Sequence, residues 1–449
     1  MNGFNLSDIT DAKLGTTTLG SIYLGSTKLW PLGTDYSQEY FTIESLADNN
    51  TITWNFTGSD PIQNVIYWSK NGTSWTSAIA STSDTPVSLA TLNKGEKMYL
   101  KGENATYALS SKSEYSHFNS DYEFNVYGNI MSLIYGDNFI GKTTLSSSRN
   151  FVNIFNSSKV VDASNLILPA TTLTKFCYRY MFNGCTSLAT APALPATTLA
   201  QSCYNSMFYG CTSLATAPAL PATTLANYCY NNMFYGCTSL ATAPALPATT
   251  LAQSCYGYMF YGCTSLATAP ALPATTLADY CYSYMFEGCS SLITAPELPA
   301  TILANSCYMS MFAATKITAA PELPATILTD SCYRNMFYGC SSLITAPELP
   351  ATILQPKCYQ HMFFGCTSLK TAPELPATTL ATYCYAYMFQ NCTSLSYIKC
   401  LATDISASNS HDYWLYNVAS TGTFIKPTSM YSWPANANGI PSGWTVVNV

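Results

Sequence analysis

A repeated unit of 26 residues occupies the second half of the chain and constrains its fold more than any other feature. One copy, LPATTLAQSCYNSMFYGCTSLATAPA, starts at Leu194, and nine copies follow one another through residues 169–395. A degenerate copy precedes them at Ile154–Pro169. Because a unit of this length cannot bury its own apolar side chains, each copy must stack on its neighbours. The first cysteines of the copies are Cys177, Cys203, Cys229, Cys255, Cys281, Cys307, Cys332, Cys358 and Cys384.

The positions of the repeat divide into unvarying and varied ones. The leucine, the first cysteine and the Met-Phe pair recur in nearly every copy, as Leu199, Cys203 and Phe208 do in the second. We expect these side chains to point inward. The two residues between Cys-Tyr and Met-Phe differ from copy to copy, and we expect them to face water. The candidate surface contacts at these positions are Asn205, Asn231, Asn232, Tyr258, Tyr284, Arg334, Gln360, His361 and Tyr387.

Spacing within each copy predicts its local structure. The fixed cysteine and the Met-Phe pair are four to five residues apart, which predicts a helical turn or short helix. Pro192 and Pro195 have no N–H group and cannot lie inside a paired ladder. We therefore expect a short strand at Ser187–Ala191, followed by a bend. The tyrosine after each first cysteine recurs in all nine copies, so we expect it to pack between coils.

The repeat resembles the BspA-like leucine-rich repeats. The shared features are the aromatic-Gly-Cys run FYGCTSL, the proline of LPATTL and the phenylalanine of MF, whereas the doubled proline and the Thr/Ala-rich strands depart from the pattern. The resemblance implies a mainly β fold with short helical turns, in which about nine coils form a leucine-rich-repeat solenoid. Such repeats are similar to those of adhesion-linked surface proteins of anaerobic bacteria. They also resemble modules in phages of gut Bacteroidales.

Shorter segments flank the array. Residues 1–34 predict a β arm, and its IYLGSTKLWP stretch resembles the N-terminal anchor segments of phage virion proteins. Residues 35–115 contain evenly spaced strand-like runs, such as TITWNF and NVIYWS, which predict a β-sandwich of immunoglobulin or fibronectin type. Residues 116–168 predict a further strand pair and the cap that covers the first coil. Residues 396–449 predict a C-terminal cap containing three of the seven tryptophans, with carbohydrate stacking by those tryptophans as the alternative.

One motif resembles a nucleotide-binding loop. Gly136–Thr143 matches G-x-x-x-x-G-K-[ST] and follows the apolar run IMSLIY. A P-loop requires a helix that begins at the lysine and holds phosphate with its free N–H groups. After Lys142 the chain instead continues TTLSSSRN, and too few residues remain for a βαβ unit. We interpret the motif as a strand followed by a glycine turn, and we predict no cofactor.

The 18 cysteines form two columns, exemplified by Cys203 and Cys211, plus Cys400. We favour buried free thiols, because cysteine is readily buried and no histidine or carboxylate accompanies the cysteines at zinc spacing. A disulfide ladder and a metal site stay open as alternatives.

The glutamates of the later copies recur at one position of the repeat. This placement predicts a row on one surface that is either solvated or meets a basic partner, unlike the facing carboxylates that a glycosidase needs. We therefore predict no catalytic residue and no metal ligand. The row consists of Glu297, Glu322, Glu348 and Glu374.

Composition narrows the classes of function. Charged residues make up 9% of the chain, compared with about 25% in an ordinary soluble domain. The net charge is −6 without a basic block, which disfavours nucleic-acid binding. No apolar run reaches the length of a membrane-spanning helix, so membrane insertion is not expected. The first residues, MNGFNLSDITDAKLG, lack the basic and apolar regions of a secretory signal, so we expect synthesis in the bacterial cytoplasm.

These observations predict a non-enzymatic phage virion structural protein of the tail-fibre or head-fibre type. Its N-terminal region would bind other virion proteins. Its repeat array would attach to a polysaccharide or protein of the host surface. A bacterial cell-surface adhesin of the same repeat family is the alternative. The sequence leaves the oligomeric state open, including a homo-oligomer.

Overall fold

The computed structural model describes residues 35–58, 64–82, 86–109, 114–431, 433–436 and 438–449, together with the backbone of four short strands nearer the N-terminus. Within the predicted β arm, β3 and β4 pair antiparallel. The side chains of the 1–34 arm lie outside the described residues, and its anchoring role stays a prediction. The four strands are β1 (Lys13–Leu14), β2 (Thr17–Thr18), β3 (Ile22–Leu24) and β4 (Thr27–Trp30).

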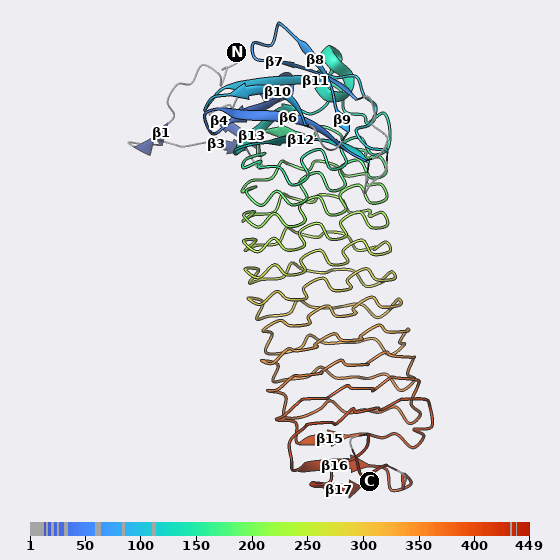
Figure 1. Cartoon of the computed structure of the whole chain (residues 1–449). Helices are drawn as coiled ribbons and strands as arrows, with labels where there is room; N and C mark the ends of the chain where they lie inside the picture. Colours follow the sequence, from blue (N-terminus) through green and yellow to red (C-terminus); the bar gives the residue numbers. More distant parts are fainter. Residues whose placement is uncertain are drawn as a thin grey trace.

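Two sheets form the body of the N-terminal part (Figure 1). One has the strand order β10-β6-β12, with β9 also paired to β6, and the other has the order β14-β13-β5-β11-β7-β8. The elements up to β13 are the 3-10 turn η2 (Tyr36–Gln38), β5 (Phe41–Ser45), β6 (Asn50–Thr57), β7 (Val65–Ser69), β8 (Thr76–Ile79), β9 (Ser81–Thr82), β10 (Val87–Leu92), β11 (Lys97–Gly102), β12 (Tyr115–Ser120) and β13 (Phe124–Asn129).

The sheets share one apolar core. Strand β6 alternates buried and half-buried residues along its whole length, which is the pattern of a strand with one face in a core. The ring of Trp54 lies 4.5 Å from that of Phe118 in its own sheet, and Phe118 lies 5.6 Å from Phe41 in the other sheet. The strand pair predicted within 116–168 is present as β12 and β13, and each joins a different sheet. The immunoglobulin or fibronectin type stays a prediction.

The repeat array begins directly on this core. Strand β13 pairs in parallel with β14 (Leu166–Ile167), which belongs to the first coil. The ring of Phe155 lies 5.7 Å from Phe41 in the sheets and 5.1 Å from Phe182 in the next coil. The sheets therefore cover the open end of the array, as a cap must.

The strand predicted at the IMSLIY run is wrong. Ser132–Tyr135 forms the short helix α1, and Gly136–Asn138 forms the 3-10 turn η3. The Asn129 side chain accepts a hydrogen bond from the Met131 N–H, and the Ser132 hydroxyl donates to the carbonyl of Leu100. These side-chain bonds favour a turn over continued pairing. Among the described residues α1 is the only α-helix, so the chain is mainly β. No helix in the described residues has the length and apolar character to cross a bilayer.

Successive copies stack as coils along a rod, with the sheets at one end and the C-terminus at the other (Figure 1). Isolated parallel bridges link them in place of continuous strands. Within the strand predicted at Ser187–Ala191, only Thr190 makes such a bridge. The extended stretch is short because the Leu188 N–H turns back to the carbonyl of Cys185 and Pro192 has no N–H. A second column of bridges, which the sequence analysis missed, joins Thr172, Thr198, Thr224, Thr250, Thr276 and Ile302.

The helical turn predicted between the cysteine and the Met-Phe pair is also wrong. In the second copy the N–H groups of Cys203 and Asn205 bond three residues back, whereas those of Tyr204 and Ser206 bond to the next coil. Ser202 and Ser206 both have φ of +55°, and left-handed residues recur at every fourth position of this segment. A helix would keep all of its N–H groups within one coil. Here alternate backbone N–H groups instead donate hydrogen bonds to the neighbouring coil.

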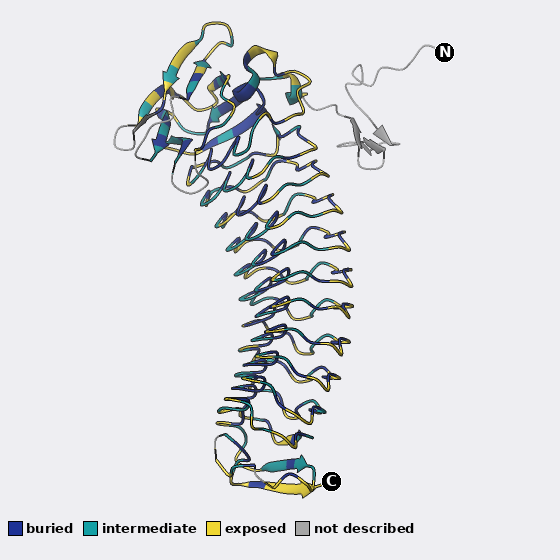
Figure 2. Cartoon of the chain, turned by 90° about the vertical axis from the view of Figure 1, so that its right-hand side faces the viewer, coloured by how far each residue is buried: buried dark blue, intermediate teal, exposed yellow. Residues whose placement is uncertain are grey.

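Buried residues recur on every coil of the rod, as the dark blue segments of Figure 2 show. The first-column cysteines are 0% exposed, and the tyrosines after them are at most 1% exposed. Rings of neighbouring coils stack face to face, for example Tyr204 on Tyr230 at 5.9 Å and Phe208 on Phe234 at 5.6 Å. The predicted packing of this tyrosine column between coils is therefore confirmed.

The array extends beyond residue 395, where the sequence analysis ended it. The N–H groups of Tyr385, Tyr387 and Phe389 bond to a further coil at residues 410–414. A parallel sheet then closes the rod, formed by β15 (Tyr397–Lys399), β16 (Gly422–Lys426) and β17 (Trp444–Asn448).

The C-terminal tryptophans belong to this cap. Trp414 stacks between Tyr385 and Trp433, with ring centroids 6.1 and 5.1 Å away. Trp414, Trp433 and Trp444 are all buried, at 0%, 8% and 7% exposed. The alternative of carbohydrate stacking on exposed tryptophans is therefore wrong, because their ring faces already contact other side chains.

Candidate interaction surfaces

The nine predicted contact residues lie in two adjacent columns, which are formed by the two positions between Cys-Tyr and Met-Phe of each copy. Their exposure was predicted wrongly for Asn205 and Gln360, which are buried at 5% and 7% exposed. The other seven are partly buried. Stacking contributes to this burial, because side chains such as Asn205 and Tyr258 contact their counterparts in the next coil. The first column holds Asn205, Asn231, Arg334 and Gln360, and the second holds Asn232, Tyr258, Tyr284, His361 and Tyr387.

Asparagines join the early coils through a chain of hydrogen bonds. The Asn205 amide donates to Asn231 Oδ1 at 3.1 Å, and the Asn232 amide donates to the same oxygen at 2.6 Å. Asn231 in turn donates to the carbonyl of Gly257 at 3.0 Å. Asn205 also accepts from Arg179 Nε at 3.1 Å. Many hydrogen-bond donors and acceptors of these side chains are therefore already bonded between coils, so fewer of them are available to a ligand.

Aromatic rings continue the second column in the later coils. Tyr258 stacks on Tyr284 with centroids 4.3 Å apart, and His361 stacks on Tyr387 at 4.6 Å. Burial and the nearby positive charge of Arg334 lower the pKa of His361 to about 4. The imidazole is therefore neutral at pH 7 and acts here as an aromatic ring.

A third column, which the sequence analysis missed, lies beside these two. It contains the residue before the glycine of each FYG run. Tyr209, Tyr235 and Tyr261 stack at 4.5 Å, and Tyr338 stacks on Phe364 at 4.6 Å. The sequence signal was present, because this position varies between copies just as the predicted contacts do.

The aromatic residues of the second and third columns form a surface that we call the aromatic strip, which is interrupted at the sixth copy by Ser310 and Ala313. Tyr258 lies 6.1 Å from Tyr261, and His361 lies 5.9 Å from Phe364, so the two columns touch. Because stacked rings cover each other's faces, the strip presents mainly ring edges and polar groups to solvent. The strip consists of Tyr209, Tyr235, Tyr258, Tyr261, Tyr284, Tyr338, His361, Phe364, Tyr387 and Tyr413.

Glu287 and Ala313 interrupt the third column between Tyr261 and Tyr338. Glu287 takes the position that Tyr261 holds one coil earlier, and its buried Oε2 atom has no hydrogen-bond partner within the described part of the chain. Burial raises the pKa of this half-buried carboxyl to about 7. Glu287 is therefore partly protonated near neutral pH, unlike an ordinary surface glutamate.

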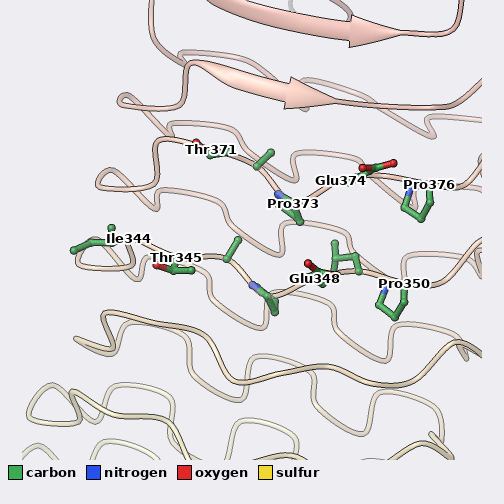
Figure 3. Close-up of a pocket in the computed structure, with 12 residues that line it drawn as sticks. Ile344, Thr345, Glu348, Pro350, Thr371, Pro373, Glu374 and Pro376 are labelled. Atoms are coloured by element: carbon green, nitrogen blue, oxygen red, sulfur yellow. The ribbon is translucent and has the colours of Figure 1, made fainter. Parts of the chain in front are cut away.

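The glutamate row lies on a grooved side of the rod. All four of its residues are exposed, as predicted. A groove of about 660 Å³ separates the segment Ile344–Pro350 from its counterpart in the next coil, with Glu348 and Glu374 on neighbouring coils (Figure 3). Glu374 forms an ion pair with Lys399 at 3.0 Å. The row is thus open to solvent along proline-lined grooves.

The cysteines are all buried free thiols, which was the favoured interpretation. In the second column each sulfur donates to the phenylalanine carbonyl of the preceding coil, for example Cys237 to Phe208 at 3.1 Å. Burial raises the pKa of Cys237 to about 12. A protonated thiol is a poor nucleophile and a poor metal ligand. Across the described part of the chain, no group of three or more metal-binding side chains lies together.

The side chains of the segment Gly136–Thr143, which resembles a nucleotide-binding loop in sequence, contact neighbouring residues of the N-terminal part. Asp137 bonds to Lys101 at 2.6 Å and to the hydroxyl of Tyr40 at 2.8 Å, and these bonds lower the pKa of its carboxyl. Lys142 lies 5.4 Å from the ring of Tyr135. The residues that follow it form turns and bends, so no helix N-terminus is available for phosphate.

Comparison with known proteins places the repeats in a family. No curated protein shows significant similarity to the chain. The family described as BspA type leucine rich repeat region matches in six copies, over residues 152–293, 204–344 and 303–437. These matches span more than half of the chain and include the coil beyond residue 395. The chain therefore belongs to the BspA-type leucine-rich-repeat family.

Proposed function

We propose that this protein is a non-enzymatic adhesive protein whose repeat array binds a surface through the aromatic strip. The observation that carries the proposal is the set of partly exposed rings on the second to fifth and the seventh to ninth copies, whose residues vary between copies while the core beneath them stays constant. Tyrosine suits such a surface because it supplies rigid contact area and a hydroxyl at low entropic cost. The BspA-type family is typically non-enzymatic, which agrees with this role.

The stacked coils would act as one leucine-rich-repeat solenoid. Each coil offers only a few ring edges and polar groups, so a single contact is weak. Because the coils are held in one rod, many such contacts add along its length. The bound surface would be a polysaccharide or a protein of a host cell, since ring edges and hydroxyls recognise both.

The setting that we propose is a phage virion, in which the protein is a tail or head fibre. The resemblance of the 1–34 arm to virion anchor segments supports this setting. The position of the two sheets at one end of the rod also supports it, because attachment there would leave the array projecting (Figure 1). A bacterial cell-surface adhesin is the second candidate, supported by the adhesion-linked members of the same family.

Quantitative mass spectrometry of purified particles tests the setting. Phage particles and bacterial envelopes would be prepared from the source culture, and this chain would be quantified against the major capsid protein. A fixed stoichiometric ratio in the particles is expected. Recovery on the envelopes, with none in the particles, would contradict the virion setting and leave the cellular adhesin.

A further inference from the structure

The grooved side of the rod changes its chemistry partway along the array. The residue after Ser-Leu is alanine in the first four copies, but it is Ile293 in the fifth and Ile344 in the seventh. Pro-Ala-Thr is followed by threonine in the first five copies, but by isoleucine in the next three. The residue before the second Leu-Pro changes from alanine to glutamate. All three changes fall within residues 293–374.

These substitutions create a surface that we call the isoleucine–glutamate strip. Its isoleucines are 56–78% exposed, and the most exposed is Ile327. A single exposed isoleucine needs no explanation, but five within four adjacent copies form an unusual apolar surface. Grooves of about 460 and 660 Å³ run beside the glutamates. The strip consists of Ile293, Ile302, Ile327, Ile344 and Ile353 with Glu297, Glu322, Glu348 and Glu374.

We propose that the isoleucine–glutamate strip docks a positively charged amphipathic α-helix of a partner protein. Within the described residues, Glu297, Glu322 and Glu348 form no ion pair. The end of the row shows how an ammonium group fits there, because Lys399 of the next coil pairs with Glu374 at 3.0 Å. Lysine or arginine side chains of a partner would neutralise the other three glutamates in the same way, while its apolar side chains cover the isoleucines.

Charge excludes a second copy of this chain as the occupant. Two copies that paired through the same strip would bring one glutamate row against another. Like charges brought together across an interface cost several kcal/mol. The occupant must therefore carry the opposite charge.

The spacing of the row favours a helix over an extended strand. Coils that bridge as parallel strands lie about 4.8 Å apart, so the four glutamates span about 14 Å. Three turns of an α-helix at 5.4 Å span about 16 Å. Same-face residues of a strand recur about every 6.8 Å and would span about 20 Å over three steps. The spacing of basic residues on one face of a helix is therefore close to that of the glutamates, whereas the spacing on one face of a strand is too large.

Fluorescence anisotropy with the full chain and labelled 18-residue peptides tests the proposal. The first peptide places lysines on one helical stripe beside leucines, and the second carries glutamates in place of the lysines. The third has the first sequence with two central prolines, which prevent a helix. We expect the lysine peptide to bind, the glutamate peptide not to bind, and the proline peptide to bind about tenfold more weakly.

Variants of the chain locate the binding. The substitutions Glu297→Ala, Glu322→Ala and Glu348→Ala restore the alanine found in the first four copies, so the coils should stay folded. This variant should bind the lysine peptide about tenfold more weakly.

A matched control removes the same amount of charge elsewhere. The substitutions Glu39→Gln, Glu44→Gln and Glu114→Gln alter one glutamate of strand β5 and two that lie just before β5 and β12, and they should leave binding unchanged. Thermal melting would verify that both variants fold. Equal binding by the wild type and the Glu→Ala variant, or equal binding of the lysine and proline peptides, would overturn the proposal.

Discussion

The Sγ atom of Cys237 lies 3.1 Å from the carbonyl oxygen of Phe208, which belongs to the preceding coil. The same contact recurs from Cys185 to Cys392, wherever the second cysteine is present. The sixth copy, which we call the short copy, is one residue shorter than the others and lacks the second cysteine. There Thr315 takes the place of the cysteine, and its hydroxyl donates to the carbonyl of Phe312 at 2.7 Å. The second column of cysteines therefore joins neighbouring coils as hydrogen-bond donors, without disulfides.

Buried thiols should make the fold sensitive to alkali. Burial raises the pKa of Cys237 from 9.0 to about 12, and that of Cys289 likewise. Between these values the unfolded chain releases thiol protons that the folded chain retains, so stability falls as the pH rises. Each such thiol costs about 1.4 kcal/mol per pH unit. With 18 of them the sum exceeds the 5–15 kcal/mol of an ordinary domain.

We therefore expect cooperative loss of the circular dichroism signal at about pH 10. Titration of the chain between pH 8 and pH 12, with recovery on return to pH 8, measures this transition. A chain that stayed fully folded at about pH 11.5 would contradict the thiol account.

One substitution in the short copy should raise the free energy of unfolding of the chain. Ala314 has φ of +56° at a position where seven copies carry a left-handed glycine. A left-handed backbone costs a residue with a Cβ about 1 kcal/mol, whereas glycine adopts it freely. Ala314→Gly should therefore raise the free energy of unfolding by about 1 kcal/mol.

The reverse substitution provides the control. A Cβ built on Gly236 would lie 3.9 Å from Gly210 Cα, so space is available and only the backbone conformation opposes it. Gly236→Ala should lower the unfolding free energy by about 1 kcal/mol. Urea denaturation of both variants measures the changes, and a stabilising Gly236→Ala would refute the argument.

Glu287 should destabilise the array above neutral pH. Its pKa is raised from 4.5 to about 7, so the folded chain holds a proton in this range that the unfolded chain has lost. Stability contributed by this residue is thus lost as the pH rises from about 4.5 to 7. Glu287→Gln removes the charge and should raise the melting temperature at pH 8. At pH 4 the difference should largely vanish, and an equal gain at both values would disprove the burial explanation.

One buried tyrosine hydroxyl should be dispensable. The hydroxyl of Tyr230 is buried and has no hydrogen-bond partner among the described residues, while its ring stacks on Tyr204 and Tyr256 at 5.9 Å. An unsatisfied buried hydroxyl costs about 1–3 kcal/mol. Tyr230→Phe keeps the stacking and should raise the melting temperature. Tyr230→Leu, which removes the ring, should lower it, and a lower melting temperature for Tyr230→Phe would contradict the account.

The sequence predicted the parts of the fold that depend on periodicity. A step of 26 residues, shortened to 25 only between Cys307 and Cys332, was enough to place the cysteine, tyrosine and phenylalanine columns in the core. It could not reveal the left-handed conformation of residues such as Tyr258, because tyrosine rarely adopts it and only the hydrogen bonds between coils stabilise it there. For the same reason the spacing predicts a helical turn where the structure has left-handed turns bonded to the next coil.

Exposure was the weaker part of the prediction. Variation between copies was taken to mean exposure, yet Asn205 is buried by its own counterparts in the stack. The Tyr209 column was overlooked because it adjoins the fixed phenylalanine and glycine. Its stacking depends on the distance between coils, which no single copy encodes.

Binding of the full chain to bacterial envelopes tests the adhesive function most directly. Envelopes of bacteria from the source culture would be titrated with fluorescent wild type and with the variant Tyr258→Ser, Tyr284→Asn, Tyr387→Asn. Serine and asparagine occupy this left-handed column in other copies, as Ser206 and Asn232 do. The matched control would carry the three Glu→Ala substitutions of the grooved side. We predict that the tyrosine variant binds at least about tenfold more weakly while the control binds as the wild type does. Wild-type binding by the tyrosine variant would contradict the aromatic strip as the adhesive surface.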